Sequence, residues 1–273
     1  MPRLIVVDSI TQLPPDARGG MAIAGSHGGV YAAYCAVRAG LRAVIFNDAG
    51  IGRERAGVAG LDYLEGFGIA ATTVSHRSAR IGNGADTQTR GVLSTVNPAA
   101  AKLGIKPGMS AGEAARQLLE HAPEIAVAAP EQRETRVSLL PRDENGPAVA
   151  LLDSAALIGP PDQGQIVVTG SHGGLVGEKP ESALKIEAFA AVFNDADLGI
   201  DGAGITRLPA LDRRGVAAAT VSAWSARIGD GPSIYGDGII SHINETARRY
   251  GGEIGISARR FVDRMRQAGK ERA

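Results

Sequence analysis

Short apolar runs alternate along this chain with segments whose apolar residues recur at helical spacing. In the first part, aliphatic and β-branched runs predict strands at residues 4–9, 21–25, 42–46 and 69–74. Helical spacing with Gly stops predicts helices at residues 30–39, 56–67, 91–103 and 110–121. Strands that alternate with helices in this way predict a mostly parallel sheet with helices on its faces, which is an α/β fold.

The same order of elements returns in the second part of the chain. Strands are predicted at residues 149–154, 165–169, 190–193 and 216–221. Helices are predicted at about 182–190, 204–213, 238–250 and 257–267. The chain is therefore expected to form two tandem homologous halves, residues 1–121 and 147–273, related by a pseudo-twofold. Residues 122–146 have no counterpart and are expected to form a linker with an extra hairpin built from strands at 125–129 and 136–140.

Three polar motifs follow strands in both halves. Gly-Ser-His-Gly-Gly at 25–29 returns 145 residues later (172 − 27) at 170–174. Phe-Asn-Asp-Ala and Ser-Ala-Arg-Ile-Gly return in the same order, the latter at 78–82 and 225–229. Because ligands of open parallel sheets bind outside the carboxyl ends of the strands, we expect these motifs to converge on one site in each half. One half's Arg completing the other's site is a further option.

The motifs suggest roles for their residues. Imidazole near a carboxylate suits acid–base catalysis near neutral pH, so the expected catalytic residues are His27, His172, Asp48, Asp195, Ser26 and Ser171. Glycine-rich turns and Arg suit the binding of an anion. The expected substrate-binding residues are Gly28, Gly29, Gly173, Gly174, Asn47, Asn194, Ser75, Ser78, Arg80, Ser222, Ser225 and Arg227. Structural turns, caps and ion pairs remain the alternative for each motif.

Composition narrows the class of protein. Lys plus Arg and Asp plus Glu number 29 each, so no net charge attracts nucleic acid or an acidic membrane. No apolar run approaches the roughly 20 residues of a membrane helix. A single cysteine, Cys35, excludes an internal disulfide and fits a reducing cytoplasm. The glycine turn is neither a Walker loop nor G-x-G-x-x-G, and the histidines lack common metal-ligand spacings, so no cofactor or metal is expected.

The stretches around Asn47 and His27 resemble caspase-like peptidases of the CHAT type. In that family one strand ends in His-Gly, as at 27–28 and 172–173, and another ends in the catalytic Cys, followed by an acidic residue, a Gly and a long helix. The resemblance implies a parallel α/β sheet. Asn47 and Asn194 stand where the nucleophilic Cys would be, and a carboxamide supplies no thiolate.

The sequence favours a small-molecule hydrolase acting on a polar, anionic or amide-bearing metabolite, with a C–N bond as the preferred target. The first alternative is a non-catalytic ligand-binding or assembly protein on a degenerate caspase-like scaffold. The second is a metal-dependent hydrolase. The expected partner is a small molecule, and a homo-oligomer remains open.

Overall fold

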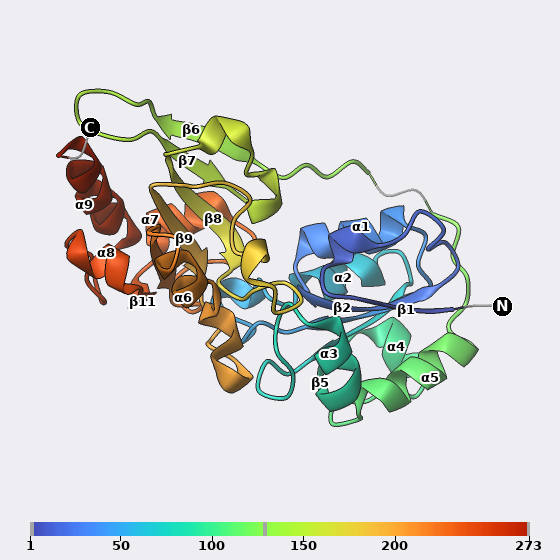
Figure 1. Ribbon diagram of the computed structural model, residues 1–273. Coiled ribbons are helices and arrows are strands. Elements are labelled where there is room, and N and C mark those ends of the chain that lie inside the picture. The colour runs from blue at the N-terminus through green and yellow to red at the C-terminus, as the bar shows by residue number, and fades with distance from the viewer. Residues whose placement is uncertain (1–2, 128–129, 272–273) are drawn as a thin grey trace.

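The structure is a computed structural model that describes residues 3–127 and 130–271. Its first half contains a sheet of strand order β1-β2-β3-β4-β5 (Figure 1). The first four strands run parallel, and β5 is antiparallel to β4. The strands are β1 (Leu4–Val7), β2 (Met21–His27), β3 (Ala43–Asn47), β4 (Ala70–Val74) and β5 (Leu93–Val96).

The second half repeats this order and adds one edge strand. Its sheet has the order β11-β10-β9-β8-β7-β6, in which β7 to β10 are parallel and both edge strands are antiparallel. The strands are β6 (Arg136–Leu140), β7 (Val149–Leu152), β8 (Ile166–His172), β9 (Ala190–Asn194), β10 (Ala217–Val221) and β11 (Ile240–Ile243). The predicted α/β fold with two similar halves is confirmed.

Helices cover both faces of each sheet. In the first half, α1 (Val30–Arg38) and α2 (Ala59–Glu65) pack with Phe46 on one face, while α5 (Ala111–His121) packs with Ile45 on the other. In the second half, α6 (Arg207–Asp212) lies on one face, and α7 (Gly231–Asp237) and α9 (Ala258–Lys270) lie on the other. Strands buried on both faces explain their continuous apolar runs. No helix within 3–127 and 130–271 is long and apolar enough to cross a membrane.

Two predicted helices begin as strands. The segments 91–103 and 238–250 start with β5 and β11 and only then form the short helices α4 (Pro98–Lys102) and α8 (Glu245–Arg249). Ser, Thr, Val and Ile are common in these strands, and such residues favour a pleated edge. The helices α3 (Gly84–Arg90) and α7 were not predicted, although Asn83 and Asp230 cap them.

The predicted helix at 182–190 is absent. Only a 3₁₀ turn at Pro180–Ser182 forms, and the chain then runs irregularly into β9. The backbone carbonyls of Ser182 and Ala183 accept hydrogen bonds from Arg207, and those of Leu184 and Ile186 accept from Arg214. Tertiary hydrogen bonds have therefore overridden the helical tendency of this loop.

The described residues of the linker form one strand, β6, where two were predicted. Its β6 pairs with β7, but residues 125–127 are not in a strand, and residues 128–129 of the other predicted strand lie outside the described part. In Figure 1 residues 130–135 run along the top of the molecule to β6 in the second half.

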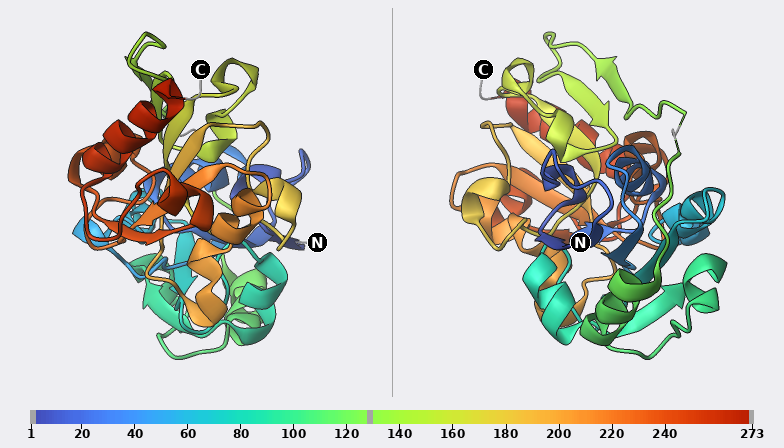
Figure 2. Two further views of the ribbon diagram at one scale, coloured as in Figure 1. Left: turned by 60° about the vertical axis from the view of Figure 1, so that its left-hand side comes forward. Right: turned by 90° about the vertical axis from the view of Figure 1, so that its right-hand side faces the viewer.

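The halves meet through the loops at the carboxyl ends of their sheets, as Figures 1 and 2 show. The contacts are reciprocal: the N–H of Arg53 donates to the carbonyl of Ala223 (2.8 Å), and the N–H of Ile200 donates to that of His76 (2.8 Å). These residues are equivalent in pairs, 147 positions apart (200 − 53). A small apolar cluster of Ala49, Ile81, Ala196, Ala203 and Ile228 also draws equivalent residues from both halves. These contacts place a pseudo-twofold between the two sheets.

Candidate functional site

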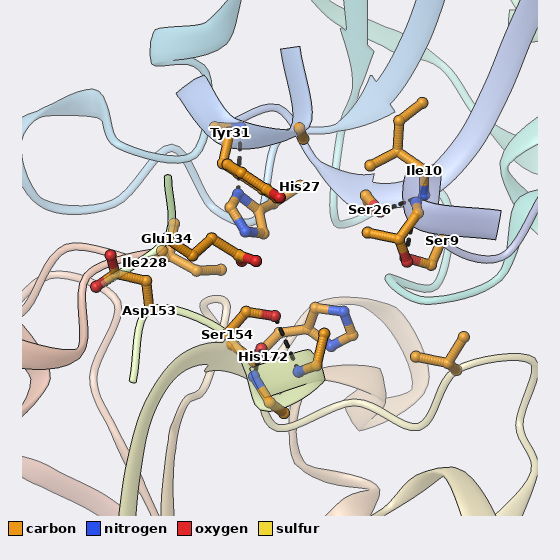
Figure 3. Close-up of a pocket in the computed structure, with 18 of the residues that line it drawn as sticks. Ser9, Ile10, Ser26, His27, Tyr31, Glu134, Asp153, Ser154, His172 and Ile228 are labelled. Atoms are coloured by element: carbon orange, nitrogen blue, oxygen red, sulfur yellow. Dashed lines mark hydrogen bonds between the residues drawn. The ribbon is translucent and has the colours of Figure 1, made fainter. Parts of the chain in front are cut away.

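A cavity of about 640 Å³ lies between the two halves (Figure 3). His27 at the end of β2 and His172 at the end of β8 both line it. A cavity of this size suits a small molecule. Instead of two sites, one in each half, the convergence of strand ends produces one cavity shared by both.

Irregular pairing positions each histidine. Along β2 and β3, Ile23 is paired with Ile45, but His27, four residues on, is paired with Asn47, only two residues on. The second half has the same irregularity between Val168 and His172. Extra residues in one strand form a bulge, which redirects side chains at a sheet end. Gly25 occupies the bulge because a Cβ there would collide with the backbone of Asn83.

Both imidazoles are held in one orientation by the glycine turn. The N–H of Gly29 donates to Nδ1 of His27, and the N–H of Gly174 donates to Nδ1 of His172. The N to Nδ1 distance is 3.2 Å in each case. Burial lowers the pKa of His27 from 6.5 to about 4. Burial, the Arg207 charge and His27 lower the pKa of His172 well below 6.5. At neutral pH both rings are therefore uncharged, with the proton on Nε2.

The Nε2 atoms remain free to bind a ligand. Within the described residues neither Nε2 forms a hydrogen bond, and neither is a fully buried atom without a partner. Each ring lies against a glycine of the other half. A Cβ on Gly229 would lie 3.4 Å from Cε1 of His27, and one on Gly82 would lie 3.3 Å from Cε1 of His172. The Ser-Ala-Arg-Ile-Gly motif of one half thus reaches the histidine of the other.

The expected grouping of His27 with Asp48 is wrong. The Asp48 carboxylate accepts hydrogen bonds from the ring and the backbone of His76 and from the N–H of Gly50. Its equivalent, Asp195, accepts from the N–H groups of Asp197 and Ala223. Neither carboxylate lines the cavity. These aspartates organise the loops where the halves meet.

The amides and glycines that recur in both halves are also used within the fold. The Asn47 and Asn194 amides donate to the carbonyls of Ala79 and Ala226 and accept from Ala49 and Ala196. The N–H groups of Gly28 and Gly173 donate to the carbonyls of those same two asparagines. Together with the bonds from Gly29 and Gly174 to the histidines, these contacts use the N–H groups of all four glycines within the fold.

The six serines divide into two sets. Ser26 and Ser171 line the cavity. The Ser26 hydroxyl accepts the backbone N–H of Ile10 and the Ser171 hydroxyl accepts that of Ala155, each with an N to Oγ distance of 2.9 Å. The others form turns outside the cavity lining, where their hydroxyls bond to nearby backbone; they are Ser75, Ser78, Ser222 and Ser225.

The repeated arginines already have carboxylate partners. Arg80 pairs with Asp86 (3.0 Å) and Glu178 (2.6 Å) and does not line the cavity. Arg227 does line it, but pairs with Asp230 (2.8 Å) and Glu54 (3.0 Å). Their charges are neutralised within the protein, which leaves less attraction for a ligand anion.

Two further residues of the cavity were not identified from the sequence. Glu134, in the linker before β6, reaches in between Tyr31 and Ser154 (Figure 3). Burial raises the pKa of Glu134, although hydrogen bonds from Ser154 and Tyr31 oppose the rise. Arg207, at the start of α6, is 5% exposed. Both lack a counterpart in the other half, so the motifs repeated in the two halves do not include them.

The chain matches no protein-family model, no curated protein and no solved structure. The resemblance to CHAT-type peptidases therefore stays a prediction. Among the described residues, no group of three or more His, Cys, Asp and Glu side chains is arranged to hold a metal ion.

Proposed function

We propose that this protein is a hydrolase of a small polar metabolite, with a carbon–nitrogen bond as the favoured target. The active site is the cavity between the halves. The observation that carries the proposal is the pair of uncharged histidines, which present Nε2–H donors to one cavity from opposite walls. Donors fixed in advance in a buried site stabilise the negative charge that develops on a carbonyl oxygen.

The low pKa values change the roles expected for His27 and His172. A base with a pKa of about 4, as in His27, removes protons poorly at neutral pH. A neutral imidazole is instead a good hydrogen-bond donor to a carbonyl oxygen. We therefore assign the two histidines to the developing oxyanion.

Glu134 supplies the base in this proposal. Its raised pKa lies closer to neutrality than that of an ordinary carboxylate, which favours proton transfer. Glu134 takes a proton from water as the water oxygen adds to the substrate carbonyl carbon. The tetrahedral oxyanion is held by the histidine N–H groups. When the C–N bond breaks, the proton passes from Glu134 to the leaving nitrogen.

Release of amine or ammonia from a panel of small amides and N-acyl amino acids tests this function. Replacing both His27 and His172 by Ala should lower turnover by about 10²-fold or more, as removal of oxyanion donors does. His121→Ala is the matched control, because that side chain is 53% exposed at the end of α5. Turnover that persists unchanged in the double variant would exclude the histidines from the mechanism.

A ligand-binding protein without turnover is the second candidate. It is favoured by the way Ser26 and Ser171 are used, because both of these hydroxyls accept backbone N–H groups and neither is hydrogen-bonded to a base among the described residues. Under this alternative the double histidine variant loses affinity, and no amide in the panel is cleaved by the unmodified protein.

A further inference from the structure

Arg207 is a buried cation without an anionic partner among the residues that the structure describes. Its side chain donates from Nε to the carbonyl of Gly174 (2.9 Å) and from Nη1 to those of Ser182 (3.1 Å) and Ala183 (2.5 Å). No carboxylate lies within ion-pair distance of it in the part of the chain that the structure describes. Burial lowers the pKa of Arg207 to about 10, so it stays charged at neutral pH. A buried charge without a counter-ion is unfavourable.

One edge of this guanidinium is open to the cavity. Arg207 is a lining residue, and its Nη2 neither forms a hydrogen bond within the described residues nor is a fully buried atom without a partner. The ring of Phe193 lies under the guanidinium, 5.1 Å from its carbon, and fixes its plane. Nη2 is therefore the Arg207 donor that remains available to a ligand in the cavity.

Only the second half has this cation. The N–H of Arg207 donates to the carbonyl of Gly173, and the equivalent bond in the first half runs from Gly60 to Gly28. A Cβ on Gly60 would lie 2.5 Å from the carbonyl oxygen of Gly29, so no side chain fits there. The loop that binds Arg207 also places the exposed Lys179 and Lys185 in the cavity lining, whereas the first half has helix α1 in its place. The two walls therefore differ in charge.

We propose that Arg207 is the anion subsite of this cavity and that it binds the carboxylate of a small-molecule ligand. Carboxylate side chains outnumber cations in the cavity lining, which favours a singly charged group over a phosphate dianion. The orientation that follows rests on the proposed function: the carboxylate lies at Arg207 on the second half, and the reacting carbonyl lies within reach of both histidines and Glu134.

The subsite is coupled to His172 through one residue. Gly174 accepts a hydrogen bond from Arg207 at its carbonyl and donates one to His172 from its N–H. The Arg207 charge helps to lower the pKa of His172. An anion bound to Arg207 offsets that charge, so the pKa of His172 rises when the subsite is filled.

Titration of the full chain with acetate, followed by imidazole NMR signals and calorimetry, tests the subsite. Acetamide serves as the uncharged isostere and inorganic phosphate as the alternative anion. Acetate should bind the unmodified protein and shift the titration of His172 to higher pH, and acetamide should do neither. Arg207→Gln should weaken acetate binding about 10- to 100-fold, as expected for the loss of a charged hydrogen bond. Arg227 also lines the cavity, but its charge is already paired, so it serves as the matched control. Arg227→Gln should change the affinity for acetate by less than about 3-fold.

Four results would overturn the subsite: no acetate binding, tighter binding of phosphate than of acetate, dependence on Arg227 instead of Arg207, or equal binding of acetamide. If Arg207→Gln does not fold, the test uses Arg207→Lys together with the titration of His172 in the unmodified protein. A His172 titration that acetate does not shift would then contradict the proposal. The hydrolase proposal is tested independently by amide cleavage, because acetate binding at Arg207 does not require turnover.

Discussion

The Asp48 carboxylate and the His76 imidazole are joined by a buried contact, with Oδ1 and Nδ1 2.8 Å apart. The other ring nitrogen of His76, Nε2, lies 3.1 Å from Oδ2 of Asp197 in the second half, though not in hydrogen-bond alignment. Burial raises the pKa of Asp48, but the hydrogen bonds from the ring and backbone of His76 outweigh it, and the pKa is lowered. His76 therefore links a carboxylate of each half.

Replacing His76 by Ala should weaken the junction between the halves. The variant leaves Asp48 with the backbone N–H groups of Gly50 and of position 76 and with the Ser94 side chain as donors. Asp195 likewise accepts a backbone N–H from Ala223, which occupies the position equivalent to His76. We expect the free energy of unfolding to fall by about 1–3 kcal/mol, the usual cost of losing a hydrogen bond to a buried charge. Chemical denaturation measures this change, with His121→Ala as the exposed control. A loss no larger than that of the control would show that the contact adds no stability.

The pH dependence of stability should reveal the buried neutral His27. Its pKa is about 4 in the folded state and about 6.5 when unfolded, so between these values only the unfolded chain binds the proton. The folded protein is therefore destabilised as pH falls from 6.5 to 4, by up to about 3 kcal/mol from this residue. Unfolding free energies at pH 7 and pH 4.5 should differ less in His27→Gln than in the unmodified protein. Equal differences would mean that His27 titrates normally.

Glu134→Gln should remove the base and leave the fold intact, because Glu134 lies in the linker and is only partly buried. In the unmodified protein, turnover should fall as pH drops through the raised pKa of Glu134, where the carboxylate becomes protonated. The variant should lose turnover by about 10²-fold or more, without that acidic limb. Glu131→Gln, an exposed linker carboxylate, is the control. An unchanged acidic limb in Glu134→Gln would assign it to another group.

Two equivalent glycines should differ in their tolerance of a side chain. Gly82 and Gly229 have φ angles of +79° and +82°, so Ala at either position incurs the left-handed penalty of about 1 kcal/mol. A Cβ at Gly82 would also collide with the carbonyl oxygen of Leu175, whereas at Gly229 the nearest atom is Cε1 of His27 at 3.4 Å. Gly82→Ala should therefore be the more destabilising by about 1–3 kcal/mol in thermal or chemical unfolding. Equal losses would mean that the Leu175 loop moves away freely.

The four parallel strands of each half and their order along the chain were predictable, because buried parallel strands read as apolar runs. The antiparallel edge strands β5 and β11 were predicted as parts of helices. The histidines were also located correctly, at strand ends facing a cavity. Their partners were not. Asp48 follows β3, the next strand after the one that ends in His27. The rule that sites form at the carboxyl ends of parallel strands does not tell which carboxylate the His27 ring will contact. His76 has no equivalent histidine in the second half, where Ala223 takes its place, and this asymmetry allows His76 to bridge Asp48 and Asp197.

Glu134 and Arg207 show the limit of comparing the two halves with each other. Residues that recur in both halves are those that the shared fold requires, such as Ser26 and Asn47, whose side chains accept hydrogen bonds from backbone N–H groups. A residue used once in an asymmetric cavity has no repeat to reveal it. The unpaired charge of Arg207 becomes visible only when its neighbours are known, because sequence alone does not show whether a carboxylate lies nearby.

The joining of both halves in one chain has a consequence for how a substrate can enter. In an assembly of two identical chains, every side chain on one wall would appear on the other, and a molecule could bind equally well in either direction. Here Arg207 faces the cavity from one side, and Gly60 occupies the equivalent place on the other. The two ends of the cavity therefore differ, and we expect an asymmetric molecule to bind in a single direction.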